Sequence, residues 1–116
     1  MKESILTSIK KLLGIIDTYE NFDTDIIIHI NSVFTTLKQL GVGPEKGFRI
    51  TGKTETWDMF MTEEEFLDSV KTYIYLKVKI VFDPPLNASV MEAYKQEINQ
   101  FEWRLNVDGD TNVETQ

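Results

Sequence analysis

The residues most suggestive of chemistry lie in a glycine-rich stretch near the middle of the chain. Gly47–Thr54, with the sequence GFRITGKT, matches the phosphate-loop pattern G-x-x-x-x-G-K-[S/T], and IVFD at 80–83 imitates the strand end that accompanies it in nucleotide-binding proteins. Such a loop binds phosphate only when a buried strand leads into the glycines and a helix begins at the lysine. Here a helix end and the residues GVGP precede the string. We therefore expect an exposed, flexible loop and keep nucleotide binding at 47–54 as a remote alternative.

No other group of residues assembles an active site. The chain has no cysteine, and its single histidine, His29, excludes a multi-histidine metal site within one chain. The acidic run Glu63–Glu65 is explained by a helix start, in which Thr62 caps the helix and Glu65 completes a capping box. We predict no enzyme, no catalytic residue, no metal and no cofactor, and expect a binding or structural role.

The composition of the chain limits the kinds of partner that the protein can bind. With 116 residues and 41% hydrophobic content, the chain is most simply one domain with a modest core. Its net charge of −7 disfavours a protein that binds nucleic acid by neutralising phosphates. No apolar run approaches the roughly 20 residues of a membrane span, so we expect no membrane partner.

The positioning elements are helices, recognised from apolar residues that repeat with a period of 3.6. The first covers 4–13, with Ser4 as its N-cap and Gly14 as its stop. The second covers 24–40, with Asp23 as its expected N-cap. Its apolar surface is wider than one buried face requires, because Ile27 and Phe34 flank the main stripe. This second apolar flank predicts that the helix over 24–40 either lies at the centre of the bundle or buries its second side in an interface.

The second half of the chain predicts two longer helices after a short turn that carries Trp57 and Phe60. Residues 72–82 are rich in β-branched and aromatic types, but a helical stripe continuous from the capped start favours a helix over 63–82. Proline at 84 and 85 stops it. The last helix covers 88–105 and begins after Asn87 or Ser89. Trp103 lies off its stripe and is a candidate for an external contact.

The sequence thus predicts an all-α fold, a small bundle of four main helices at 4–13, 24–40, 63–82 and 88–105. A long glycine-rich loop over 41–56, which has room for a short extended piece, joins the second and third. Residues 1–105 form the helical domain. Residues 106–116 carry three acidic side chains and only two apolar ones, so we expect a flexible acidic tail that is disordered in the free protein.

The order and spacing of these pieces resemble the head–tail connector, or adaptor, proteins of long-tailed phages, a family also labelled DNA-packaging proteins. The resemblance is carried by IKKLLGI, FDTDIIIHINSVFTTLKQLGVGP, the W-x-x-F piece at 57–60, YIYLKVKIVFDPP and MEAYKQEINQFEWRLN, and covers nearly the whole chain. It implies a structural protein that assembles as a ring, commonly of twelve subunits, beneath the portal protein, and that links the head to the next head-completion or tail protein. It places the chain in the virion, and in the host cytoplasm during assembly.

The resemblance also suggests roles for residues. DNA would pass through the ring's channel without sequence-specific binding, which the negative charge favours. We expect the oligomer interface to include Ile27, Phe34, Phe48, Ile50, Trp57 and Phe60, and portal docking to use Trp103, Asn106, Val107 and Val113. The main alternative is a small helical regulatory module that binds one host protein.

Overall fold

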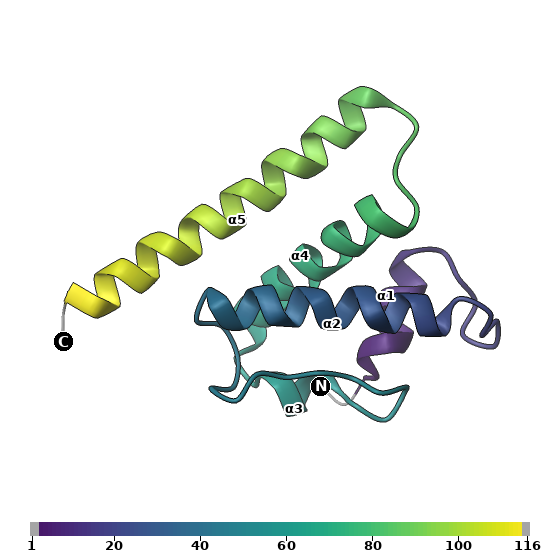
Figure 1. The fold of residues 1–116 in the computed structure, drawn as a ribbon, viewed down its shortest axis with the longest axis horizontal. Helices are drawn as coiled ribbons and strands as arrows, with labels where there is room; N and C mark the ends of the chain where they lie inside the picture. The colour runs from purple at the N-terminus through teal and green to yellow at the C-terminus, as the bar shows by residue number, and fades with distance from the viewer. Residues whose placement is uncertain (1–2, 115–116) are drawn as a thin grey trace.

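A computed structural model describes residues 3–114 of the chain, with side chains for residues 3–105. Within that range the backbone forms helices and no strand, and the predicted all-α fold is confirmed. The helices are α1 (Ile5–Leu12), α2 (Asp23–Gln39), α3 (Trp57–Phe60), α4 (Glu64–Phe82) and α5 (Ala88–Glu114) (Figure 1). The four main helices lie where the apolar periodicity predicts them, and α3 is the short turn.

The first helix begins and ends through the predicted local chemistry. The Ser4 side chain accepts a hydrogen bond of 3.3 Å from the backbone N–H of Thr7, which satisfies one of the donors left free at a helix start. Gly14 follows the helix with φ +83°, a left-handed conformation that glycine adopts without strain. Lys10, in the last turn of this helix, is fully buried.

The core forms where α2 crosses α4, with α1 packed against both. The predicted stripe of α2 is buried, and the segment over 72–82 is helical, so its strand-like composition was overridden by the helical stripe. The fully or nearly fully buried apolar side chains include Ile5, Leu6, Ile9, Ile26, Ile30, Val33, Phe34, Leu37, Leu67, Val70, Ile74 and Val78.

The loop over 41–56 folds back on α2 instead of projecting from the domain. The Asn31 side-chain amide donates to the Ile50 carbonyl at 2.9 Å, and its Oδ1 accepts from the Ile50 N–H at 2.7 Å. An isolated antiparallel bridge joins Ser4 to Thr56. The expected exposed loop is therefore wrong for its middle part, because Ile50 is fully buried.

Two predicted N-caps are also wrong. Asp23 is the first residue of α2 rather than its cap, because its carboxylate turns toward Lys10. α4 begins one residue later than predicted, with Glu63 at the cap position and no side-chain cap bond, so the Thr62–Glu65 capping box does not form. The acidic first turn of α4 still complements the helix dipole.

The last helix, α5, is a long arm that packs mainly along α4, and its C-terminal end lies apart from the other helices (Figure 1). Asn87 caps it by accepting from the backbone N–H groups of Ser89 at 2.8 Å and Val90 at 3.3 Å, which decides between the two predicted starts. The helix continues to Glu114, nine residues past the predicted end at 105. The side chains of 106–116 lie outside the described residues, and the flexibility of this tail stays a prediction.

Candidate interaction surfaces

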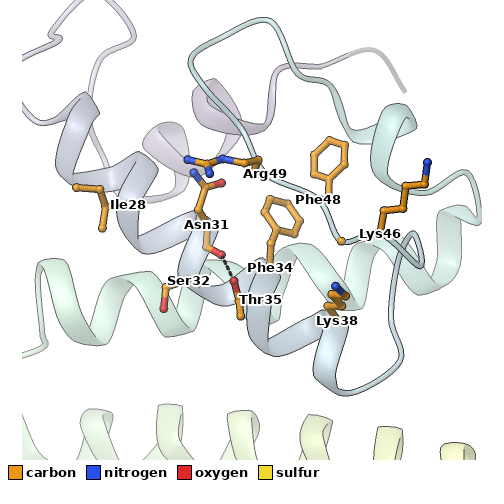
Figure 2. A pocket seen from close by; sticks show the side chains of 10 residues that line it. Ile28, Asn31, Ser32, Phe34, Thr35, Lys38, Lys46, Phe48 and Arg49 are labelled. Carbon is orange, nitrogen blue, oxygen red and sulfur yellow. Dashed lines mark hydrogen bonds between the residues drawn. The ribbon is translucent and has the colours of Figure 1, made fainter.

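A hollow with a volume of about 470 Å³ lies on the surface between α2 and the returning loop. Its lining is Ile28, Asn31, Ser32, Phe34, Thr35, Lys38, Lys46, Gly47, Phe48 and Arg49. Figure 2 shows the rings of Phe34 and Phe48 in its middle, with Lys38, Lys46 and Arg49 around them. The two rings meet edge to face with centroids 5.2 Å apart.

This hollow is positively charged, although the chain as a whole is negative. Three of its lining residues are basic and none is acidic. Lys38, Lys46 and Arg49 are exposed, and none of them forms an ion pair within the described part of the chain. Sequence reasoning missed this site because Lys38 stands on a helix and the other two on a loop whose path the sequence does not reveal.

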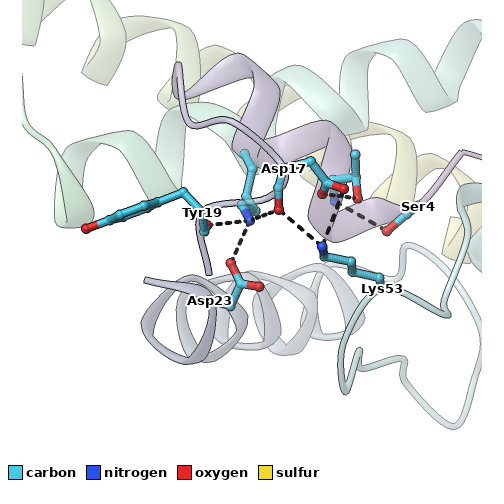
Figure 3. Close-up of polar contacts among 7 residues, drawn as sticks. Ser4, Asp17, Tyr19, Asp23 and Lys53 are labelled. Atoms are coloured by element: carbon cyan, nitrogen blue, oxygen red, sulfur yellow. Dashed lines mark hydrogen bonds and ion pairs between the residues drawn. The ribbon is translucent and has the colours of Figure 1, made fainter. Parts of the chain in front are cut away.

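A second polar cluster ties α1 to the start of α2 around the buried Lys10. Its Nζ donates to the carbonyl oxygens of Asp17 at 2.9 Å and Tyr19 at 2.8 Å, and lies 2.8 Å from Oδ1 of Asp23 (Figure 3). Three oxygens therefore replace the water that the ammonium loses on burial. The sequence signal that could have indicated the burial of Lys10 was its position, since it is four residues after Leu6 and therefore lies on the same buried face of the helix.

Lys53, the lysine of the phosphate-loop string, joins the same cluster from the opposite side. Its Nζ lies 3.1 Å from the Asp17 carbonyl oxygen and 3.4 Å from its Oδ2 (Figure 3). A hydrogen bond from the Thr7 hydroxyl, aided by Lys53 and Lys10, holds the pKa of the Asp17 carboxyl below its ordinary value. Lys53 thus holds two loops together on the surface.

The string lacks both structural requirements of a phosphate loop. Among the described residues no strand leads into it, and the next helix, α3, begins only at Trp57. The Glu55 carboxylate accepts from the backbone N–H of Thr51 at 3.0 Å and of Gly52 at 3.4 Å, and from the Thr51 hydroxyl at 2.7 Å. Burial raises the pKa of Glu55, but these bonds outweigh it and lower the pKa overall. The backbone N–H groups of Thr51 and Gly52 thus bind the Glu55 carboxylate of the same chain in place of a phosphate.

Most of the residues expected at an oligomer interface lie in the core of the single chain. Phe34, Ile50, Trp57 and Phe60 are buried in the core of the single chain, and Ile27 and Phe48 are half-buried. Phe34, Phe48 and Phe60 form one aromatic cluster, with ring centroids 4.9–5.5 Å apart. The Trp57 indole N–H donates to the Ser8 hydroxyl at 2.9 Å. One chain does not test contacts between chains, so the interface stays a prediction, but in this conformation the four buried residues present almost no surface to a neighbour.

Other apolar side chains are exposed on several elements. Ile28 on α2 is 59% exposed and Val81 on α4 is 62% exposed, and Leu86 in the following connection is fully exposed. Trp103 on α5 is 67% exposed, which agrees with its expected place off the stripe. The other predicted docking residues, Asn106, Val107 and Val113, lie outside the described side chains.

The described residues contain no cluster of three or more side chains suited to hold a metal ion. Among the described helices, none combines the length and the apolar character that crossing a membrane requires.

Comparison with known proteins identifies the family. A family model described as phage connector protein matches residues 5–112, which spans the chain from the start of α1 to near the end of α5. No curated protein and no solved structure gives a significant match. The match confirms the resemblance carried by the sequence, and its family is one of structural proteins that assemble with phage head and tail components. The chain belongs to the phage connector protein family.

Proposed function

We propose that this protein is a head–tail connector that forms a closed ring under the portal of a tailed phage, extends the DNA channel and links the head to the next connector or tail protein. The observation that carries the proposal is the family match, which covers the four main helices together rather than one motif. The role is structural and non-enzymatic.

Exposed apolar surface supports assembly of this kind. A ring of identical subunits uses a heterologous interface, in which two different patches of one chain meet on neighbouring copies. Ile28 on α2 offers one patch, and Val81 and Leu86 at the end of α4 offer another. The half-buried Ile27 and Phe48 remain candidates beside Ile28, whereas the four buried residues now belong to the core.

The long arm of α5 supports portal docking. It runs along α4, and Trp103 stands exposed in its second half. A large aromatic side chain in that position can insert into a pocket of a partner without disturbing the fold. The net charge of −7 suits a channel that DNA passes without capture, because like charges repel.

Portal binding by single-site variants tests the docking role. Trp103→Ala should leave thermal stability unchanged and weaken binding to the purified portal by at least about tenfold, the loss typical of a central aromatic contact. Val90→Ala, at another exposed position on α5, is the matched control and should bind like the wild type. Equal portal binding by Trp103→Ala would remove this residue from the interface.

Virion composition separates the connector from the regulatory module that binds one host protein. Quantitative mass spectrometry of purified particles should find the chain in ring copy number, about twelve for each portal vertex if the ring follows the common arrangement of the family. Absence of the chain from mature particles would reject the connector role.

A further inference from the structure

The basic hollow between α2 and the returning loop has no assigned role in the connector. Elsewhere in the described chain, several basic side chains are neutralised by acidic ones: Lys10 by Asp23, Lys53 by Asp17, Lys77 by Glu102 and Lys79 by Asp83. The hollow gathers Lys38, Lys46 and Arg49 with no acidic neighbour in its lining. On a chain of net charge −7, it is the natural place for an acidic group from outside.

The same chain carries an acidic segment that matches this hollow. Residues 106–116 contain Asp108, Asp110 and Glu114 and no basic residue, so three negative charges stand against three positive ones. The end of α5 that bears them lies apart from the bundle, and α5 packs mainly on α4 rather than near α2 (Figure 1). A segment that points away from its own domain is placed to reach another copy.

We propose that the basic hollow of one subunit binds the acidic C-terminal segment 106–116 of a second copy. The three positive side chains meet the carboxylates of the segment, and the half-buried ring of Phe48 gives an apolar contact for Val107 or Val113. This deepens the proposed ring, on which it rests, because hollow and segment are different surfaces of one chain and so make a heterologous contact. It assigns Asn106, Val107 and Val113 to a neighbour and leaves Trp103 to the portal.

The test reverses each set of charges and then combines them in full-length chains. One variant carries Lys38→Glu, Lys46→Glu and Arg49→Glu, and a second carries Asp108→Lys, Asp110→Lys and Glu114→Lys. Self-association is measured by sedimentation velocity at about 0.1 M and about 1 M salt, between which the Debye length falls from about 10 Å to about 3 Å.

A matched control reverses three basic residues outside the hollow, Lys11, Lys95 and Arg104, which are also exposed. It changes the net charge by the same amount as reversal of the hollow. Circular dichroism confirms that each variant retains its helices.

The proposal expects salt-sensitive self-association of the wild type, a loss of at least about tenfold in either hollow or tail variant, and little change in the control. An equimolar mixture of the two reversed variants should associate again, because each then offers the charge that the other lacks. A wild type that stays monomeric at every concentration, or a mixture that does not associate, refutes it. A single chain that carries both sets of reversals again has opposite charges on its hollow and its tail. If that chain remains monomeric, its tail occupies its own hollow, which also refutes the proposal.

The outcome is separable from that of the proposed function. If both reversed variants still form rings on the portal as well as the wild type does, the tail contact is rejected and the connector role stands. If the wild type forms no ring on the portal, the connector role itself fails.

Discussion

Replacing the buried Lys10 by methionine is the sharpest test of how this small domain is held together. The ammonium contacts two backbone carbonyls and the Asp23 carboxylate at 2.8–2.9 Å, and its side chain is fully buried. Methionine fills much of the same volume but leaves the Asp23 carboxylate without its cation and the Tyr19 carbonyl without the Lys10 donor, while the Asp17 carbonyl keeps only the hydrogen bond from Lys53. The change thus removes one polar junction between α1, its following loop and α2.

The expected cost follows from these contacts. Removing one partner of a buried ion pair costs about 3–5 kcal/mol. The Asp23 side chain is 17% exposed and can be partly rehydrated, as can carbonyls of a surface loop, so we expect about 3–4 kcal/mol. A domain of this size has a free energy of unfolding of about 5–15 kcal/mol, so Lys10→Met should still fold. Its Tm should fall by roughly 12–16 °C.

Urea denaturation of a double-mutant cycle measures this cost. Lys10→Met, Asp23→Ala and the double variant should show a coupling of about 2 kcal/mol, since the second change removes a charge already stranded by the first. Lys11→Met is the matched control on the exposed side of α1 and should stay within about 0.5 kcal/mol of the wild type. A loss below about 1 kcal/mol for Lys10→Met, or an additive cycle, would show that the ammonium is not held as described.

Three further predictions concern the returning loop. Asn31→Ala should lower the free energy of unfolding by about 1–3 kcal/mol, because it removes both hydrogen bonds to Ile50, whereas the neighbouring Ser32→Ala should change it by less than about 0.5 kcal/mol; equal urea midpoints would contradict the anchoring of the loop. Gly43→Ala should lower the Tm more than Gly41→Ala in a thermal melt, because both glycines have positive φ but only at Gly43 would an added Cβ collide with the Phe60 ring; the reverse order would refute the close approach. The pKa of Glu55 is lowered, so the stability it contributes is present above its ordinary pKa of 4.5 and is lost as the pH falls through the folded value; Glu55→Gln should unfold with a shallower acid dependence, and identical acid profiles would reject the Thr51 and Gly52 bonds.

Most of the fold was predictable because it depends on local signals. The stripe of α2, the two prolines after α4 and Gly14 after α1 each act within a few residues, and the structure confirms the helices they delimit. The end of α5 was placed too early because residues 106–116 carry three acidic side chains and only two apolar ones, yet the backbone continues as a helix to Glu114.

The interaction surfaces were less predictable because they depend on the path of a loop. Phe34 lies beside the main stripe of α2 and was expected to face a neighbour, but Phe48 and Phe60 return to cover it. The same return brings Lys46 and Arg49 beside Lys38. Helical periodicity describes one element at a time, so it identifies surplus apolar surface without showing which later segment covers it.

Electron microscopy of the protein mixed with its purified portal tests the central claim most directly. The account predicts a closed ring of density beneath the portal, with one connector chain for each portal subunit and an open channel on the axis. A portal that remains bare at saturating connector concentration, or that carries scattered copies without a closed ring, would contradict it.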